Sequence, residues 1–248
     1  MMMNEKIKLL GDAIERAGNI CVFTGAGISC PSGIPDFRSA DGLYNGDGMG
    51  RFTPEQIISH GFFCSKPEMF YEFYKSKMMY PDAKPNAAHL YFAGLEKTGK
   101  KVSVVTQNID GLHTDAGSTC VFEIHGSVRR NHCLKCGAFY DGDYVYRQSG
   151  IPYCAKCGGM LKPDVVLYEE SLDDNEVRGA VNAIANADLL IVVGTSLAVY
   201  PAASFLHYFK GETVALINKS QTGFDGSADI VIYDDIINVC AALTGETV

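Results

Sequence analysis

Four of the nine cysteines form two close pairs, and this pattern constrains the fold more than any other feature of the chain. Cys133 and Cys136 make one pair, Cys154 and Cys157 the other, and two residues lie inside each pair. Such spacing lets a tight turn aim both thiolates at one tetrahedral ion, so the pattern predicts a four-cysteine zinc site. Because a bound metal contributes its own folding free energy, residues near 130–160 should form a small module within a larger chain.

The predicted zinc is structural rather than catalytic. Four thiolates complete a tetrahedron, whereas a catalytic zinc keeps one coordination position open for water. The neighbouring His132 would therefore find no free position. A redox role for the Cys-x-x-Cys pairs is the alternative, but the glycines after Cys136 and Cys157 are more typical of zinc-ribbon turns than of a thioredoxin-like site.

Composition and charge narrow the class of protein. With 47% hydrophobic residues, the 248-residue chain can bury a full core. Its net charge of −8 argues against a nucleic-acid binder, and Arg129, Arg130 and Lys135 form only a local basic cluster. The remaining cysteines are scattered, which indicates a reducing compartment. We see no signal peptide and no apolar run long enough to span a bilayer, so we expect a cytoplasmic protein without a membrane partner.

Short apolar runs rich in β-branched residues recur along the chain and predict strands. They cover residues 19–24, 101–106, 120–124, 188–193, 213–217 and 229–233. Nearly continuous runs of this kind are typical of strands covered on both faces of a parallel sheet. Helical patterns lie between or beside them, at residues 4–17, 86–98, 173–186, 200–210 and 234–243. The alternation predicts an α/β fold with a doubly wound, parallel, Rossmann-like sheet.

Two insertions interrupt the alternation and predict a second, smaller domain. Residues 31–85 are rich in Gly, Pro and aromatic residues, with short helices expected near 54–60 and 67–79, and residues 126–168 hold the cysteine pairs. We expect these insertions to fold together as a helical module and a zinc ribbon. The dinucleotide-binding domain then comprises residues 1–30, 86–125 and 169–248. Ligands bind at the carboxyl ends of parallel strands, where both insertions begin, so the site should lie in a cleft between the domains.

Glycine-rich turns follow two of the predicted strands. Gly25-Ala26-Gly27 follows the first strand, where backbone N–H groups could cradle a pyrophosphate. Cys30 stands where a G-x-G-x-x-G motif has its third glycine, so a purely structural turn explains this motif nearly as well. A second turn, Gly194-Thr195-Ser196, follows residues 188–193. Two such turns suit one extended dinucleotide.

The segment Pro35-Asp36-Phe37-Arg38 allows two interpretations. It could be a packed turn with a surface ion pair. It could equally be a flap whose aromatic ring covers a ligand ring and whose arginine pairs with a phosphate.

Polar residues gather where the second strand ends, and they too allow two interpretations. Gln107, Asn108 and Asp110 could form an Asx-turn and a helix cap. They could instead line a pocket for a carboxamide and a ribose, because a carboxamide offers both a donor and an acceptor.

His125 is the best general-base candidate in the chain. It directly follows the third predicted strand, in the expected cleft, with Gly126 after it to keep backbone bulk low. An imidazole can accept a proton near neutral pH. A lone histidine is more often structural, but the other five lie in helical patterns, at a helix start or beside the zinc module.

Taken together, these motifs resemble the sirtuin family of NAD-dependent protein deacylases, in its bacterial form. The resemblance rests on residues 25–29, 32–38, 106–113, 125–126, 194–196 and 217–218 and on the two cysteine pairs. The motifs occur in family order and span nearly the whole chain. The resemblance implies NAD as a co-substrate, one structural Zn²⁺ and acyl-lysine proteins or peptides as substrates.

The resemblance also implies site residues. It implies catalytic roles for His125, Asn108 and Asp110, with His125 deprotonating a ribose hydroxyl. The residues implied to bind NAD are Gly25, Ala26, Gly27, Cys30, Asp36, Phe37, Arg38, Gln107, Asn108, Ile109, Asp110, His125, Gly194, Thr195, Ser196, Asn218, Lys219 and Ile236. The peptide is implied to add a strand at Val165, Val166, Leu167, Tyr168 and Glu169. Glu169 stands where family members usually have glycine, which leaves the peptide preference open.

The implied reaction releases nicotinamide and forms O-acyl-ADP-ribose and free lysine. Family members that favour acidic acyl groups pair a tyrosine with an arginine three residues later, whereas here Lys77 follows Tyr74. A lysine lacks the bidentate fork of an arginine, so we expect an acetyl group. Alternatives are mono-ADP-ribosyl transfer, which uses the same NAD with another acceptor, and a non-catalytic ADP-ribose-binding module.

Overall fold

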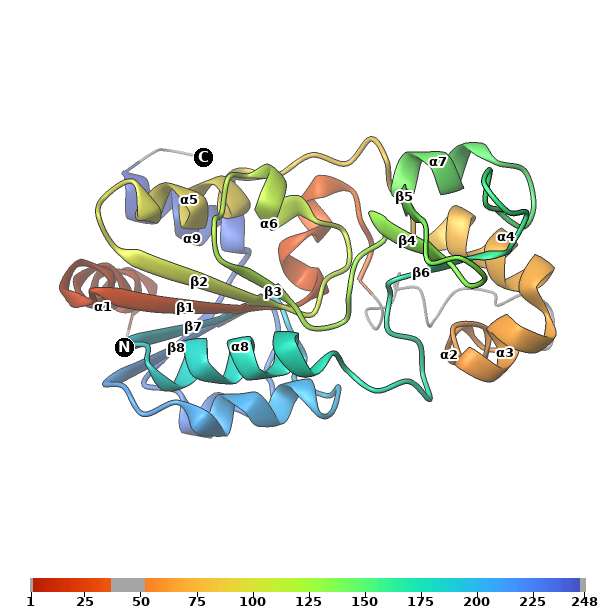
Figure 1. The fold of residues 1–248 in the computed structure, drawn as a ribbon. Coiled ribbons are helices and arrows are strands. Elements are labelled where there is room, and N and C mark those ends of the chain that lie inside the picture. The colour runs from red at the N-terminus through yellow and green to blue at the C-terminus, as the bar shows by residue number, and fades with distance from the viewer. Residues whose placement is uncertain (1, 37–51, 246–248) are drawn as a thin grey trace.

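A parallel sheet of six strands forms the centre of the larger of two lobes (Figure 1). The computed structural model describes residues 2–36 and 52–245. The strand order is β3-β2-β1-β7-β8-β9. The strands are β1 (Asn19–Thr24), β2 (Lys101–Thr106), β3 (Val121–Glu123), β7 (Leu189–Val193), β8 (Thr213–Asn218) and β9 (Ile230–Tyr233). The order reverses between β1 and β7, and this reversal opens a crevice at their carboxyl ends.

The central strands are buried on both faces, which explains their nearly unbroken apolar sequence. All five residues of β7 are buried, and so are the last five of β1. β1 pairs with both neighbours in register, so that Thr24 lies opposite Thr106 of β2 and Val193 of β7. Three strand ends therefore meet at one level of the sheet, and the loops that follow them leave from the same edge.

Helices cover both faces of this sheet (Figure 1). Leu10 and Ile14 of α1 (Met3–Arg16), Phe92 of α5 (Ala87–Glu96) and Val239 of α9 (Ile236–Thr244) pack in one apolar cluster with alternate strand residues. Ile184 of α8 (Asp174–Ala185) and Phe205 of η3 (Ala202–Tyr208) belong to a second cluster against the other face. This three-layer arrangement confirms the predicted α/β fold class.

The smaller lobe has its own sheet and its own core. Its antiparallel sheet has the order β5-β4-β6, formed by β4 (Arg130–Cys133), β5 (Phe139–Asp141) and β6 (Leu161–Pro163). Around it lie α2 (Pro54–Ile57), α3 (His60–Ser65), α4 (Pro67–Lys77) and α7 (Gly142–Arg147). Phe63 and Phe70 meet edge-to-face with ring centroids 5.0 Å apart, and Tyr71 and Tyr74 pack beside them in the same buried cluster.

Two arginines at the junction of the lobes are paired with carboxylates. Arg130 Nη1 lies 2.5 Å from Glu123 Oε2 at the end of β3. Arg129 donates to both oxygens of Asp115 at 2.5 Å and to the backbone carbonyl of Asp110 at 3.0 Å. Each arginine links the start of the smaller lobe to a loop or strand of the larger lobe. The two arginines of the basic cluster noted in the sequence therefore have carboxylate partners within the protein.

Two predicted helices take a different form in the structure. The helix expected near 54–60 ends at Ile57, because Ser59 is extended, caps the following helix α3 by accepting from Phe62 N–H at 3.2 Å, and bridges to Tyr168. The pattern at 200–210 forms the 3₁₀ helix η3. Short helical turns also occur at η1 (Ala26–Ile28), η2 (Cys30–Ser32), α6 (Leu112–Asp115) and η4 (Asp225–Ser227). Within the described residues, none of the helices has the length and apolar character needed to cross a membrane.

Candidate functional site

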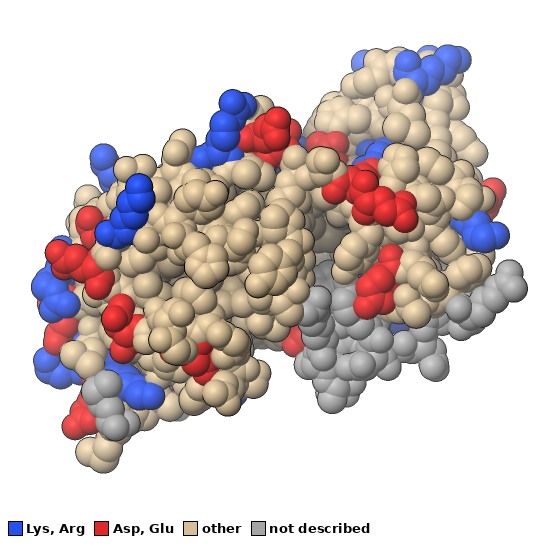
Figure 2. Space-filling model, turned by 90° about the horizontal axis from the view of Figure 1, so that it is seen from below, with Lys and Arg blue, Asp and Glu red and all other residues tan. Residues whose placement is uncertain are grey.

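A cavity of about 1210 Å³ lies between the lobes, at the carboxyl ends of the parallel strands. Figure 2 shows the surface hollowed between the larger and the smaller lobe. Turns after β1, β2, β7 and β8 form one part of its wall, and the chain that runs from β6 to α8 forms another. The volume exceeds the range typical of the site of a drug-sized ligand.

The two glycine-rich turns pack directly on each other at the floor of the cavity. Gly27 N–H donates to Gly194 C=O at 2.8 Å, and Gly25 N–H donates to Val193 C=O at 3.1 Å. A Cβ at Gly27 would lie 2.8 Å from Gly194 Cα, so a side chain cannot be accommodated there. The glycines thus have a structural role in joining the turns, and the joined turns line the cavity.

The residues after β2 are held by hydrogen bonds to both turns. Gln107 Nε2 donates to Thr195 Oγ1 at 3.0 Å. Asn108 Nδ2 donates to Gly25 C=O at 3.2 Å and to Ser29 Oγ at 3.1 Å. Since these bonds use its amide hydrogens, Asn108 is left with its carbonyl oxygen to offer a ligand. Both side chains belong to the cavity wall.

His125 lines the cavity with a defined tautomer. Its Nδ1 lies 3.0 Å from the backbone carbonyl of Gln107. A carbonyl can only accept, so Nδ1 carries the hydrogen and Nε2 keeps its lone pair. Burial lowers the pKa of His125, and the bond to Gln107 opposes this shift only in part. The imidazole is therefore neutral at neutral pH and able to accept a proton.

Asp110 lies behind the wall rather than on it. Its carboxylate accepts from Ser29 Oγ at 2.7 Å and from Leu112 N–H at 2.8 Å. Burial raises the pKa of this carboxyl, while the two hydrogen bonds oppose the shift. Asp110 is not among the described residues that line the cavity. This position differs from the expectation that its carboxylate faces the ligand. It contacts the cavity indirectly, through Ser29 and the loop of Asn108.

Two other histidines are excluded as bases because they are buried away from the cavity. His89 and His113 stack edge-to-face with ring centroids 4.7 Å apart. Burial lowers the pKa of His89 to about 4 and that of His113 to about 3. His113 Nε2 lies 3.1 Å from the hydroxyl of Thr24. This pair supports the strand ends beneath the cavity.

Residues at the end of β8 and after β9 also line the cavity. They are Asn218, which is the last residue of β8, Lys219 and Ile236. Lys219 Nζ pairs with Asp235 Oδ2 at 2.8 Å, which raises the pKa of the lysine. Its charge is thus held at the mouth of the site.

Residues 165–169 all line the cavity opposite the strand ends. Val166 N–H donates to the His125 carbonyl at 2.9 Å, and Tyr168 N–H donates to the Ile58 carbonyl at 3.0 Å. One edge of this extended segment is therefore paired within the protein. The opposite edge is also used in part, since Leu167 N–H donates to Glu170 Oε2 and Leu167 C=O accepts from Glu170 N–H, both at 3.0 Å.

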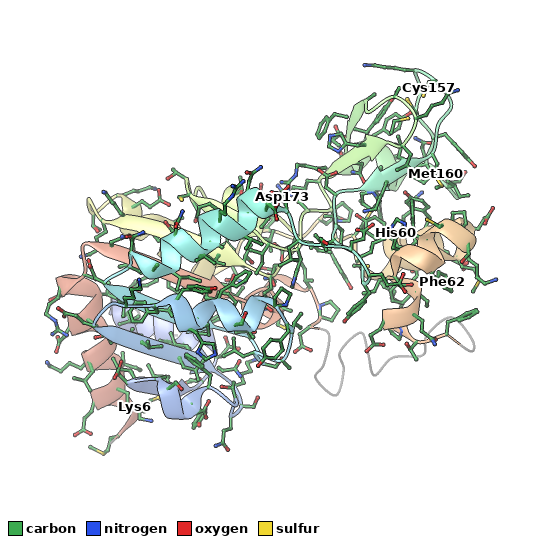
Figure 3. The ribbon with its side chains drawn as sticks, turned by 60° about the horizontal axis from the view of Figure 1, so that its bottom comes forward. Lys6, His60, Phe62, Cys157, Met160 and Asp173 are labelled. Carbon is green, nitrogen blue, oxygen red and sulfur yellow. The ribbon has the colours of Figure 1, made fainter. Side chains whose placement is uncertain are left out.

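The four paired cysteines converge at the tip of the smaller lobe, as their spacing predicts. Their Sγ atoms lie within 4.8 Å of one another, and Cys133–Cys157 and Cys136–Cys154 are 3.4 and 3.6 Å apart. These separations fit thiolates around one tetrahedral ion. Figure 3 shows Cys157 at the end of the lobe that is remote from α8 and the cleft. The cysteines are placed to bind a structural metal ion.

Comparisons with known proteins agree with this geometry. Residues 25–201 match the sequence profile of the Sir2 family. The NAD-dependent protein deacetylase of Clostridium perfringens is 56% identical over 235 residues, covering 94% of this chain and 96% of that protein. That of Clostridium acetobutylicum is 52% identical, covering 95% and 97%.

The chain belongs to the Sir2 family.

Solved Sir2 structures share the whole fold. A Sir2 enzyme structure superposes with a TM-score of 0.87 at 36% identity, covering 98% of both chains. A Sir2 complex with a deacetylated p53 peptide and 3'-O-acetyl-ADP-ribose also gives 0.87, at 34% identity over 96% and 97% of the chains. A Sir2 complex with p53 peptide and NAD⁺ gives 0.83 at 35% identity, over 99% and 98%.

Most of the site residues expected for a Sir2 protein meet in the one cavity. Those that line it are Gly25, Ala26, Gly27, Cys30, Asp36, Gln107, Asn108, Ile109, His125, Gly194, Thr195, Ser196, Asn218, Lys219 and Ile236. Phe37 and Arg38 lie outside the described residues. Tyr74 is fully buried in the core of the smaller lobe, and neither it nor Lys77 is among the described lining residues, so the pair gives no support for an acidic acyl group.

Other parts of the Sir2 cavity wall were not predicted from the sequence. These residues are Ile58, Met78, Ser171, Leu172, Asp174, Val177, Val199, Tyr200, Pro201, Phe205, Ser220 and Asp234. Some follow directly on motifs that were recognised, as Val199–Pro201 follow the turn at 194–196, and their position alone could have identified them. Ile58 and Met78 come from the smaller lobe, and no local signal in the sequence assigns them to the cleft.

Proposed function

We propose that the chain is an NAD-dependent protein-lysine deacetylase that releases nicotinamide and forms O-acetyl-ADP-ribose. One observation carries this conclusion: His125 lines the same cavity as the strand-end turns on one side and the extended segment 165–169 on the other. The relatives named above are NAD-dependent protein deacetylases. A general base between a dinucleotide site and a peptide edge is the arrangement that this reaction requires.

The residues present fit NAD. A Cβ at Gly25 would lie 2.7 Å from Thr195 Cβ, so the joined turns keep their backbone at the floor of the cavity, where a pyrophosphate could approach. Gln107, Asn108 and Ile109 would contact the nicotinamide end, and Asn218, Lys219 and Ile236 the other end. When bound, NAD supplies the ribose carbon to which the acetyl-lysine oxygen adds as nicotinamide departs.

His125 would accept the proton of a ribose hydroxyl through Nε2. The Gln107 carbonyl fixes the ring orientation through Nδ1, at 3.0 Å. The lowered pKa keeps Nε2 unprotonated before the transfer, and the developing imidazolium is stabilised by the same carbonyl. The ring thus needs no rearrangement during the reaction.

Asn108 and Asp110 would act in different ways. Asn108 would offer its side-chain oxygen to the nicotinamide ribose or to a bound water, because protein groups occupy its N–H donors. Asp110 would be a positioning residue that holds Ser29 and the turn before α6. This assignment gives Asp110 a role behind the wall instead of contact with the sugar.

The substrate would be an extended peptide that carries acetyl-lysine. It would lie along residues 165–169, which line the cavity together with His125. Ile58, Met78, Ile109 and Val165 add apolar surface to the wall. Such a surface suits the alkyl stem of lysine and a small apolar acyl group, in agreement with acetyl.

The structural metal at the four cysteines would be zinc, since four thiolates in a tetrahedral array favour that ion. It would stabilise the smaller lobe.

We further propose that the chain has two domains. Residues 1–30, 86–125 and 169–248 would form one domain, and residues 31–85 and 126–168 would form the other. Each has a sheet and an apolar cluster of its own, which supports this division. The five cysteines outside the metal cluster form no disulfide, which supports a reducing, cytoplasmic location.

The direct test is nicotinamide release with an acetyl-lysine peptide and NAD. We expect turnover by the wild type and a loss of roughly 10²–10⁴ in rate for His125→Ala, the usual cost of removing a general base. Full activity in this variant, or no turnover by the wild type, would contradict the proposal.

A further inference from the structure

The turn that ends the peptide segment holds a glutamate in a conformation that suits glycine. Glu170 N–H donates to Leu167 C=O at 3.0 Å and closes a four-residue turn. Glu169, the third residue of this turn, has φ of 75° and is one of two non-glycine residues with positive φ in ranges 2–36 and 52–245. Turns of this kind favour glycine or asparagine there, because a Cβ crowds the backbone. When a residue at a cavity keeps a strained backbone conformation, its side chain is expected to make a contact that compensates for the strain.

The Glu169 carboxylate makes a contact that accounts for its presence. Oε2 accepts a hydrogen bond from the backbone N–H of Gly61, in the first turn of α3, at 2.8 Å. The approach depends on Gly61, because a Cβ there would lie only 3.1 Å from Oε2. The glutamate in the turn and the glycine in the facing helix are therefore matched to each other. We call the hydrogen bond between Gly61 N–H and Glu169 Oε2 the clasp.

Other bonds join the same turn to the same helix. Tyr168 bridges to Ser59, and His60 N–H donates to Tyr168 C=O at 3.0 Å. The Glu170 carboxylate lies 2.8 Å from His60 Nδ1 and also accepts from Leu167 N–H at 3.0 Å. Figure 3 shows His60 at the end of α3 beside the chain that leads to α8. The turn is thus fixed to the smaller lobe at the point where the peptide segment ends.

We propose that Glu169 is a positioning residue for the acyl-lysine peptide. The clasp holds the turn on α3 and so keeps residues 165–169 in place along the cavity wall, where the peptide would lie. Without the clasp, this segment must be ordered during binding, which weakens peptide affinity and leaves His125 and the NAD turns unchanged. The inference rests on the proposed deacetylase function.

Steady-state kinetics with an acetyl-lysine peptide test the clasp. Glu169→Gly removes the carboxylate and relieves the positive φ, so we expect no loss in melting temperature. The KM for peptide should rise roughly five- to tenfold, while kcat and the KM for NAD change less than about twofold. Gly61→Ala crowds the carboxylate from the helix side and should raise the peptide KM in the same way.

Two further variants distinguish the effect of the clasp hydrogen bond from the effect of the negative charge on Glu169. Glu169→Gln keeps an oxygen acceptor but no charge, and its peptide KM should stay within about twofold of the wild type. Glu72→Gln removes an exposed charge from α4 of the same lobe and serves as the matched control. A peptide KM that rises equally in Glu169→Gln, or stays unchanged in both Glu169→Gly and Gly61→Ala, would overturn the proposal.

Peptide binding measured by fluorescence anisotropy without NAD distinguishes failure of this inference from failure of the proposed function. A wild type that binds the peptide but releases no nicotinamide contradicts the deacetylase function, and the ratio of affinities between wild type and Glu169→Gly still tests the clasp. A wild type that neither binds nor turns over the peptide contradicts both.

Discussion

Lowering the pH should destabilise the chain through the buried histidine pair. His89 and His113 have pKa values of about 4 and about 3 in the folded protein, against 6.5 for an exposed histidine, and burial is the main cause. His89 Nε2 and His113 Nδ1 are buried without hydrogen-bond partners among the described residues. Since the unfolded chain binds protons at pH values where the folded chain does not, stability is complete above pH 6.5 and falls as the pH drops toward the folded values.

The size of the effect follows from these pKa values. Between pH 8 and pH 5, each histidine removes about 2 kcal/mol from the free energy of unfolding, so the pair removes about 4 kcal/mol. His89→Phe should abolish the contribution of His89 to this pH dependence. Between pH 8 and pH 5, the free energy of unfolding of the variant should therefore fall by about 2 kcal/mol less than that of the wild type. His207→Gln, which changes an exposed histidine, serves as the control.

Urea denaturation followed by circular dichroism at pH 8 and pH 5 measures the difference. The zinc site titrates in every variant, so its contribution cancels when variants are compared. An identical loss of stability in His89→Phe and the wild type would refute the reasoning, because it would mean that the buried ring is not neutral in the folded state.

Three further predictions concern the metal, a junction glycine and the base. A strong chelator should remove one zinc per chain, measured by metal analysis, and unfold the smaller lobe; a metal-free protein with an unchanged spectrum would contradict this. Gly126→Ala should cost about 3 kcal/mol or more in urea denaturation, because φ is 74° and a Cβ would lie 1.9 Å from the Asp164 carbonyl oxygen; a cost below about 1 kcal/mol would be inconsistent. The kcat/KM profile should fall on the acid side only below pH 6.5, since burial lowers the pKa of His125; a midpoint above 6.5 would contradict a desolvated base.

The sheet could be predicted from the sequence because burial on both faces leaves a direct trace. Strands such as 19–24 and 101–106 have nearly continuous apolar sequences, and the structure has them with the same bounds. The cysteine pairs were equally direct, since metal geometry fixes their spacing. The short helix expected near 54–60 ends earlier, at Ile57, because Ser59 bridges to Tyr168, far along the chain.

Only those site residues that lie at the ends of strands could be placed in the site from the sequence. Gln107, Asn108 and His125 follow strands, so their meeting in one cavity follows from the sheet alone. The position of Asp110 could not be predicted, because its carboxylate turns to Ser29 and to Leu112 N–H, a choice made by packing. The clasp between Glu169 and Gly61 depends on how the smaller lobe folds against the segment, and no local pattern signals it.

Mass spectrometry of the reaction products tests the central claim most directly. With NAD and an acetyl-lysine peptide, we predict O-acetyl-ADP-ribose, nicotinamide and deacetylated peptide in equal amounts. An ADP-ribosylated peptide that keeps its acetyl group, or an unchanged peptide beside bound NAD, would contradict the account.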